Sequence, residues 1–211
     1  MDRAVDWRLC IITCPELSCN RSHQQVAAAA IAGGATMIQL RDKEASISKL
    51  IAVGEDLRQL TRDSSVMFIV NDHVDVALAV QADGIHLGTS DMSLAQARRE
   101  VGSEMIIGFS PSTLAEAVAA QEADYLGIGP VYSTNTKPDA GTAIGLVGLR
   151  KFIEQTRLPV IAIGGITDDN VGDVIATGAA GVAVISAVVS ADDITAATAR
   201  FRRLVEAAQR R

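Results

Sequence analysis

Short β-branched runs recur eight times along the chain, and segments with helical spacing lie between them. One such segment has apolar residues at Ile47, Leu50, Ile51, Leu57 and Leu60, which is the spacing of an amphipathic helix. The eight predicted strands are Leu9–Thr13, Met37–Arg41, Met67–Asn71, Gly84–Leu87, Met105–Ser110, Tyr125–Val131, Val160–Gly164 and Gly181–Ser186. The pattern therefore predicts a chain in which strand and helix alternate.

Turn-forming and helix-capping residues stand at the predicted boundaries between helices and strands. Pairs that contain glycine stand where a helix should return to a strand, at Gly33-Gly34, Asp83-Gly84 and Thr177-Gly178. Glycine adopts a positive φ without strain, so these pairs predict helix ends. Residues that commonly cap helix N-termini stand at Ser93, Ser112 and Asp168.

The fold class follows from the nature of the strands. Their apolar runs are typical of a parallel sheet that helices cover on its outer face. No low-complexity, charged or Pro/Ser-rich linker divides the chain, so we expect one domain over residues 1–211. A closed (β/α)8 barrel is the most economical arrangement, and an open, doubly wound sheet is the alternative, since periodicity does not report closure.

Composition narrows the classes of partner. The 211 residues carry a formal net charge of −6 and only 3% aromatic residues. Nonspecific nucleic-acid binding needs clustered cations, and single-strand binding needs aromatic platforms, so no nucleic-acid partner is expected. Small molecules are the expected partners.

No membrane partner is expected either. The longest mostly apolar stretch, Val26 to Leu40, is interrupted by a glycine pair and ends beside a charge, so it is too broken to span a bilayer. The first eight residues mix both charges and lack the apolar core of a secretory signal. Three cysteines miss the CxxC spacing of zinc and redox motifs, at Cys10, Cys14 and Cys19. A cytoplasmic protein with reduced thiols is the expectation.

Polar residues gather where the predicted strands end. In a parallel barrel the strand C-termini and the loops after them meet at one mouth, where catalytic groups lie. These positions hold Gln39 to Lys43, Asn71-Asp72, Gly88 with Asp91, Ser110, Thr134 to Lys137, Gly164-Gly165 and Ile185-Ser186. The sequence therefore predicts a site at this mouth.

The last two loops favour phosphate. Gly164-Gly165 follows the seventh predicted strand, and Ser186 follows the eighth at a predicted short helix start. Backbone N–H groups at such places often hold a phosphate in barrels. A glycine pair also suits a tight turn, and it is the position in the topology that favours phosphate.

A second, more charged site is indicated by residues from other loops. Arg41, Lys43 and Lys137 bring three cations toward one rim, which suits a multiply charged phosphate group. Asp72 and Asp91 are carboxylates at adjacent strand ends, where they could hold Mg²⁺ through oxygen ligands. Together they predict a metal-bound diphosphate.

Other chemistries find little support. His73 is predicted to begin a helix and His86 lies within a strand run, so structural roles are expected for both. The sequence has no Ser-His-Asp, Cys-His or zinc-ligand spacing. We therefore expect neither covalent catalysis nor a transition metal.

In combination and in order, these motifs resemble the thiamine-phosphate synthases. The similarity is carried by Gln39-Leu40-Arg41-Asp42-Lys43, Asn71-Asp72, Ala82 to Gly88 with Asp91, Gly127 to Val131, Thr134 to Lys137 and Ala162 to Ile166. It implies a TIM barrel, and a transferase of thiamine biosynthesis. Such an enzyme joins 4-amino-2-methyl-5-hydroxymethylpyrimidine diphosphate to a plain or carboxylated thiazole phosphate and releases diphosphate.

The resemblance also implies roles for individual residues. The pyrimidine diphosphate would be bound by Gln39, Leu40, Arg41, Asp42, Lys43, Asn71, Ser110 and Lys137. The thiazole phosphate would be bound by Thr134, Asn135, Thr136, Gly165, Ile185 and Ser186. Mg²⁺, the implied cofactor, would be bound by Asp72 and Asp91. The implied reaction is dissociative, and its catalytic residues, which neutralise the leaving diphosphate, would be Arg41, Lys43 and Lys137.

The chain departs from the family pattern at two places. Pro111-Ser112 stands where the family usually has a small residue and then histidine, and Thr89-Ser90 stands where glutamine usually precedes the acidic residue. Two other functions remain open: a thiazole tautomerase on the same barrel, and a non-catalytic binder of phosphorylated ligands. The tautomerase would not need the full diphosphate clamp, so retention of that clamp favours the synthase.

Overall fold

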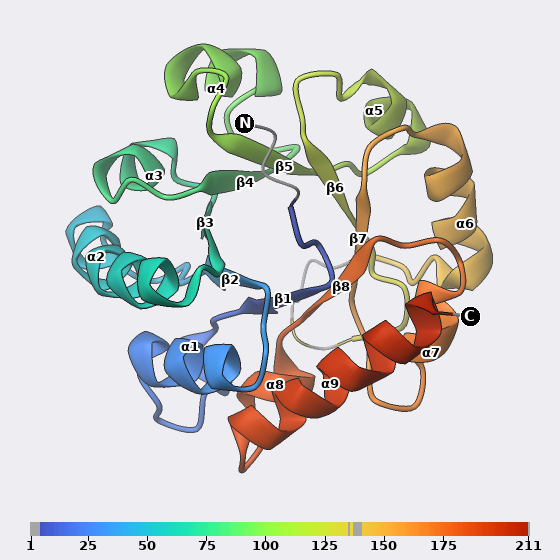
Figure 1. The fold of residues 1–211 in the computed structure, drawn as a ribbon. Coiled ribbons are helices and arrows are strands. Elements are labelled where there is room, and N and C mark those ends of the chain that lie inside the picture. The colour runs from blue at the N-terminus through green and yellow to red at the C-terminus, as the bar shows by residue number, and fades with distance from the viewer. Residues whose placement is uncertain (1–4, 135, 137–140, 211) are drawn as a thin grey trace.

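Eight parallel strands close into a barrel, in chain order from β1 to β8 (Figure 1). The protein is described by a computed structural model that covers residues 5–134, 136 and 141–210. The strands are β1 (Leu9–Ile12), β2 (Met37–Leu40), β3 (Met67–Asn71), β4 (Gly84–Gly88), β5 (Ile106–Ser110), β6 (Tyr125–Ile128), β7 (Val160–Ile163) and β8 (Gly181–Val184). The predicted closed barrel is confirmed, and the open sheet is wrong.

Helices surround the barrel on its outside (Figure 1). They are α1 (His23–Ala32), α2 (Ile47–Ser64), α3 (Val74–Ala79), α4 (Leu94–Val101), α5 (Leu114–Ala119), α6 (Gly145–Gln155), α7 (Val171–Ile175), α8 (Ser186–Val189) and α9 (Ile194–Gln209), with a 3-10 turn at Pro15–Leu17. The short α8 follows β8 directly, and the long α9 then packs against α1 and α7. It thereby covers the outer face where the barrel closes.

The apolar strand runs are explained by burial on both faces. Every residue of β1, β2, β6 and β8 is buried. One set of side chains packs beneath the helices and the alternate set faces the barrel interior, so apolar residues suit both positions. This is why the strands were recognisable from sequence.

Helix N-termini are capped as predicted at one of three positions. Ser93 caps α4 by accepting a hydrogen bond from the backbone N–H of Gln96. Ser112 is not the cap of α5, because Thr113 holds that position and forms a reciprocal capping box with Glu116. The third prediction is also wrong, because the N-cap position of α7 is held by Asn170 and not by Asp168. The Asp168 carboxylate instead forms an ion pair with Arg200 of α9.

The predicted positive-φ glycines are confirmed at two of three helix ends. Gly34 has φ +94° and Gly178 has φ +99°. The prediction at Gly84 is wrong, because the positive φ after α3 falls on Gln81, at +53°, while Gly84 opens β4. Glycine is needed there for space instead, since an added Cβ would lie 2.6 Å from the carbonyl oxygen of Ile106.

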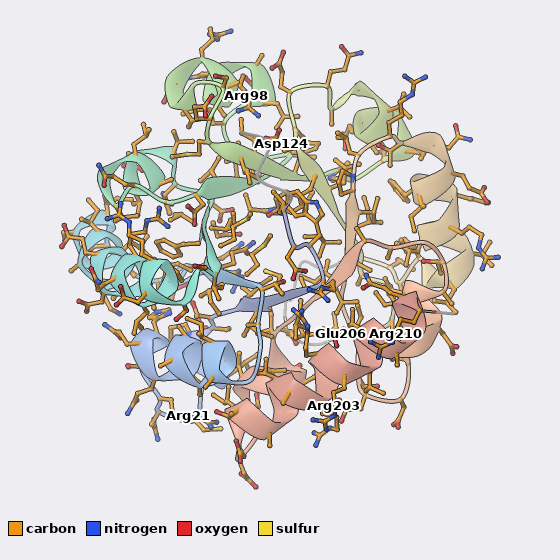
Figure 2. The ribbon with its side chains drawn as sticks, in the orientation of Figure 1. Arg21, Arg98, Asp124, Arg203, Glu206 and Arg210 are labelled. Atoms are coloured by element: carbon orange, nitrogen blue, oxygen red, sulfur yellow. The ribbon has the colours of Figure 1, made fainter. Side chains whose placement is uncertain are left out.

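Ion pairs fix the N-terminal end of the barrel. Arg58 donates to Asp83 at 2.8 Å, and the same carboxylate oxygen accepts the backbone N–H of Phe68 in β3 at 2.8 Å. Arg98 of α4 donates to Asp124 at 2.7 Å, and Asp124 accepts the backbone N–H of the second residue of β5 at 2.7 Å (Figure 2). Each aspartate thus ties a helix to the start of a strand.

None of the helices within the described residues is both long and apolar enough to cross a membrane. The closed barrel forms a single domain. Its extension over all of residues 1–211, like a location in the cytoplasm, stays a prediction.

Candidate active site

A cavity of about 710 Å³ opens at the C-terminal end of the strands. Loops that follow β2, β3, β4, β5, β6, β7 and β8 contribute to its wall. Ten of the residues predicted from sequence line it: Lys43, Asn71, Asp72, Asp91, Ser110, Thr134, Thr136, Gly165, Ile185 and Ser186. The structure therefore brings members of both predicted anion sites and both predicted metal ligands to one cavity. Two further predicted residues, Asn135 and Lys137, lie outside the described residues.

Four predicted residues of the β2 end do not line this cavity. Gln39 faces a smaller cavity of about 40 Å³ inside the barrel, beside Asn71 and Ser110. Leu40, 1% exposed, is part of the hydrophobic core. Arg41 and Asp42 are buried in the loop that follows. Any contact between these four residues and a substrate stays a prediction.

A buried threonine holds the end of β2 in place. The Thr13 hydroxyl donates to the carbonyl oxygen of Gln39 at 3.3 Å and accepts the backbone N–H of Arg41 at 3.3 Å. The Nδ1 atom of His23 lies 2.8 Å from the same hydroxyl. The loop that carries Arg41 is therefore anchored to β1 and α1.

Asp42 is held by partners within the chain. Its carboxylate lies 3.3 Å from Lys49 Nζ and 3.5 Å from His23 Nε2, and it accepts the backbone N–H of Glu44 at 3.2 Å. Burial acts to raise the pKa of Asp42, but Lys49 and His23 outweigh it and lower the pKa. Burial is also the main cause that lowers the pKa of His23 below its ordinary value, against the opposing effect of Asp42. This arrangement suits a residue that fixes the loop.

Arg41 is differently placed. The residue is 8% exposed, and its Nε atom, like that of Arg58, is buried with no hydrogen-bond partner in the part of the chain that the structure describes. One Nη atom lies 4.0 Å from Cys14 Sγ. Burial, with the nearby Glu16, raises the pKa of Cys14 to about 11, so this neighbour is a neutral thiol near pH 7. Arg58 donates to Asp83, whereas Arg41 forms no ion pair among the described residues, and a buried guanidinium without a counter-charge is suited to an anionic ligand.

The two predicted metal ligands face the cavity from neighbouring loops. Asp72 has φ +65° and its backbone N–H donates to the carbonyl oxygen of His86 at 2.9 Å. Strained backbone of this kind is concentrated at functional sites. One carboxylate oxygen of Asp91 accepts the backbone N–H of Gly88 at 2.7 Å.

The side-chain donors of the cavity wall determine which metal ion the site could hold. Among the described residues, no group of three His, Cys, Asp or Glu side chains could enclose a metal ion. Asp72 and Asp91 offer carboxylate oxygens on one cavity wall, and Mg²⁺ is commonly held by one or two carboxylates together with water and substrate phosphates. The donor set therefore fits Mg²⁺ and does not fit an all-protein zinc site.

The loop after β6 meets the start of α8. The Thr136 hydroxyl donates to Ser186 Oγ at 3.3 Å, and the Thr136 backbone N–H donates to Thr134 Oγ1 at 3.2 Å. Gly165, after β7, has φ +65°, and an added Cβ would lie 2.7 Å from Tyr132 Cβ. Glycine there allows the loops after β6 and β7 to pack together, which places three hydroxyl groups and a glycine backbone on one side of the cavity.

Two polar residues that the sequence did not indicate as functional lie next to Ser110: His86, which lines the cavity, and Tyr125, which lines the smaller cavity inside the barrel. His86 Nε2 is 2.8 Å from Ser110 Oγ, and His86 Nδ1 is 2.9 Å from the Tyr125 hydroxyl. A structural role was predicted for His86 from its place within a strand run, and the structure shows that this residue lines the cavity. The alternation of strand residues was the available signal, because alternate residues face the barrel interior.

The comparisons with known proteins agree with this geometry. A family model described as thiamine monophosphate synthase matches residues 9–188. The thiamine-phosphate synthase of Chloroflexus aurantiacus is 52% identical over 207 residues, which are 97% of this chain and 95% of that protein. That of Moorella thermoacetica is 46% identical over 205 residues, 96% of this chain and 98% of that protein.

A solved structure extends the similarity to three dimensions. The thiamine phosphate pyrophosphorylase from Pyrococcus furiosus matches with a TM-score of 0.88 and 44% identity, and the match covers 97% of this chain and 98% of that one. The family predicted from the sequence motifs is confirmed. With its closed barrel, its cavity and relatives that match over nearly their whole length, the chain belongs to the thiamine monophosphate synthase family.

Proposed function

We propose that this protein condenses 4-amino-2-methyl-5-hydroxymethylpyrimidine diphosphate with a thiazole phosphate, giving thiamine phosphate and diphosphate. Its family makes it a transferase of thiamine biosynthesis. The observation that carries the specific reaction is that one cavity is lined both by Lys43, Asp72 and Asp91 and by hydroxyl and glycine groups, which are those of Thr134, Thr136, Ser186 and Gly165. A reaction between two phosphorylated substrates needs two anion sites that share a space.

The pyrimidine diphosphate would bind on the side formed after β2 to β5. Arg41 supports this assignment, because it is buried without an ion pair among the described residues and a diphosphate would supply the counter-charge. Lys43 and Asn71 line the cavity nearby, and Ser110 contributes a hydroxyl from the end of β5. Lys137 would add a further cation from the loop after β6.

The thiazole phosphate would bind on the opposite side. Thr134, Thr136 and Ser186 lie within one hydrogen-bonded group at the cavity wall. Gly165 and Ile185 complete this side, and both line the cavity. Hydroxyl and backbone N–H donors without a strong positive charge suit a phosphate monoester better than a metal-bound diphosphate.

The chemistry that the site would support is a dissociative substitution. When the diphosphate leaves, a pyrimidine-methyl cation forms and the thiazole nitrogen attacks it, so no protein nucleophile is required. Arg41, Lys43 and Lys137 would neutralise the departing charge. Mg²⁺, when held by Asp72 and Asp91, would add further charge neutralisation on the diphosphate. Apolar side chains on the cavity wall, among them Ile128, Ile163 and Ile166, would limit the access of water to the cation.

The direct test is to incubate the purified protein with both substrates and Mg²⁺ and to measure thiamine phosphate. Product is expected only when both substrates are present. Formation of no product, with both ligands bound, would favour a non-catalytic binder. Isomerisation of the thiazole phosphate alone would favour the tautomerase.

Matched variants test the division of the cavity. Lys137→Ala is expected to weaken mainly the pyrimidine diphosphate, and Ser186→Ala mainly the thiazole phosphate, because each removes one donor from a different anion site. Calorimetry with a single substrate measures each affinity separately. If both variants lost equal affinity for both ligands, the two phosphorylated substrates would share one anion site.

A further inference from the structure

We propose that Tyr125 and His86 are positioning residues for Ser110, and that they fix its hydroxyl as a hydrogen-bond donor toward the cavity. The three side chains form a continuous series of hydrogen bonds, here called the relay, that runs from Tyr125 in the barrel interior through His86 to Ser110 at the cavity. Tyr125 lies 2.9 Å from His86 Nδ1, and His86 Nε2 lies 2.8 Å from Ser110 Oγ. His86 and Ser110 both line the cavity, whereas Tyr125 lies beneath it, 2% exposed.

The strand register creates room for this chain. His86 of β4 pairs with Gly108 of β5, and Gly108 in turn pairs with Tyr125 of β6. An added Cβ at Gly108 would lie 2.4 Å from His86 Nδ1 and 2.2 Å from Tyr125 Cζ. An added Cβ at Gly127 would lie 2.9 Å from Ser110 Oγ. The two glycines therefore leave the space through which the imidazole reaches across β5 to the tyrosine.

The direction of the hydrogen bonds follows from the groups involved. A phenol is a stronger donor than an imidazole N–H, and an unprotonated imidazole nitrogen is a stronger acceptor than a phenol oxygen. His86 Nδ1 is the hydrogen-bond partner of the Tyr125 hydroxyl within the described part of the chain. Burial raises the pKa of Tyr125 well above its ordinary value, so the phenol keeps its proton. Tyr125 therefore donates to Nδ1.

The bond from Tyr125 to His86 also sets the direction of the hydrogen bond between His86 and Ser110. A neutral imidazole that accepts at Nδ1 carries its proton on Nε2. Nε2 then donates to Ser110 Oγ, and the serine proton is left to point elsewhere. Since Ser110 lines the cavity, that proton is available to a bound ligand, and hydrogen bonds in such a series strengthen one another.

This arrangement specifies what the serine can recognise. A donor hydroxyl matches a ligand acceptor, such as the unprotonated ring nitrogen of an aminopyrimidine, and opposes a ring N–H at the same place. The assignment of that ligand rests on the proposed function. The hydrogen-bond directions among Tyr125, His86 and Ser110 do not depend on it.

The first experiment reads the tautomer directly in the protein without substrate. The chain has three histidines, so ¹⁵N and ¹³C NMR of histidine-labelled protein resolves each ring, and His86→Gln identifies the signal of His86. At neutral pH the Nε2–H tautomer is expected for His86, and in Tyr125→Phe a mixture or the Nδ1–H form. A dominant Nδ1–H tautomer or an imidazolium in the native protein would overturn the proposal.

The second experiment measures coupling to Ser110 by calorimetry with 4-amino-2-methyl-5-hydroxymethylpyrimidine diphosphate and Mg²⁺. Tyr125→Phe removes only a hydroxyl, and we expect it to weaken binding about fivefold to tenfold. The double variant with Ser110→Ala should bind no more weakly than Ser110→Ala alone. Losses that multiply in the double variant would overturn the relay. Tyr132→Phe is the matched control, because it removes the chain's other phenol hydroxyl, and it should leave binding unchanged.

The two experiments separate the relay from the proposed function. If the native protein does not bind the pyrimidine diphosphate, the assigned substrate is wrong, and the NMR measurement alone decides the relay. If the substrate binds and reacts but the tautomer is Nδ1–H, the function stands and the relay is wrong.

Discussion

The two ends of the barrel use charged residues in opposite ways. At the N-terminal end, Arg58 and Arg98 each donate to an aspartate that also accepts a strand N–H. At the C-terminal end, the buried Arg41 forms no ion pair among the described residues, although its Nε and that of Arg58 are alike in lacking a hydrogen-bond partner there. A guanidinium paired with a carboxylate ties a helix to a strand, whereas a buried cation without a counter-charge costs stability until an anionic ligand supplies one.

The difference teaches where function lies in this fold. The aspartates of the N-terminal end, Asp83 and Asp124, join helices to strands and do not line the cavity. The loops of the C-terminal end are anchored too, by Thr13 and by Asp42 with its partners. The anchoring groups do not line the cavity, whereas Lys43, Asp72 and Asp91 do. Stable supports and ligand-facing groups are thus separate residues, even within one loop.

The largest expected effect is at the acidic pair. Asp72→Asn or Asp91→Asn should lower kcat at least about a hundredfold, because a bound divalent ion contributes several kcal/mol to neutralising a leaving group. Both residues are half-buried, and asparagine keeps a side-chain oxygen that can accept the Gly88 N–H, so the free energy of unfolding should change by less than about 1 kcal/mol. Steady-state rates and urea unfolding measure the two quantities, and a chelator should abolish turnover of the native protein. Full turnover after chelation would contradict the metal assignment.

Arg41→Met should come next. It keeps most of the side-chain volume but removes the charge, so we expect the affinity for the pyrimidine diphosphate to fall about a hundredfold, which corresponds to roughly 2.7 kcal/mol. The free protein should be as stable as the native one or more so, because a buried, unsatisfied donor is removed. Calorimetry measures the affinity, and urea unfolding measures the free energy of unfolding. A variant that binds the pyrimidine diphosphate normally but unfolds at lower urea would show that Arg41 stabilises the fold and does not bind this ligand.

Arg58→Met is the matched change at the other end. The loss of its hydrogen bond to Asp83 leaves a half-buried carboxylate with only the Phe68 N–H, and should lower the free energy of unfolding by about 2 kcal/mol. The value of kcat should stay within about twofold of the native value, since neither Arg58 nor Asp83 lines the cavity. A large loss of kcat with unchanged stability would remove the distinction between the two ends.

The smallest effect is expected at the cavity rim. Ser112 lines the cavity and lies 3.3 Å from Thr89 through their hydroxyl oxygens. If departure of the diphosphate limits the rate, a proton carrier at this position matters little, and Ser112→His should change kcat by less than about tenfold, or roughly 1.4 kcal/mol of barrier. Rates at saturating substrates across neutral pH test this. An inactive native protein rescued by histidine would contradict the dissociative chemistry.

The elements of the barrel could be predicted because burial on both faces leaves a readable pattern. All eight strands were located from their apolar runs, with ends that differ from the structure by up to three residues. The cap of α5 was misplaced although the signal was present, since Thr113 and Glu116 have capping-box spacing. The pairing of Asp168 with Arg200 joins residues far apart in the chain, which no local pattern reports.

The site was predictable in part for the same reason. Strand ends converge at one mouth, so residues such as Asn71 and Ser110 could be assigned to it from the alternation alone. The anchoring role of Asp42 could not, because it depends on His23 and Lys49 from two helices. The chain from Tyr125 through His86 depends on the register across three strands, which the sequence does not specify.

The most direct measurement of the contrast between the two ends is the stabilisation that the ligand confers. A ligand that binds only the folded state raises the free energy of unfolding by RT ln(1 + L/Kd), where L is the concentration of free ligand. Urea unfolding of the native protein, Arg41→Met and Arg58→Met should be compared with and without the pyrimidine diphosphate and Mg²⁺. We predict equal ligand stabilisation for the native protein and Arg58→Met, and little or none for Arg41→Met at the same ligand concentration. Equal stabilisation of both variants would contradict the account.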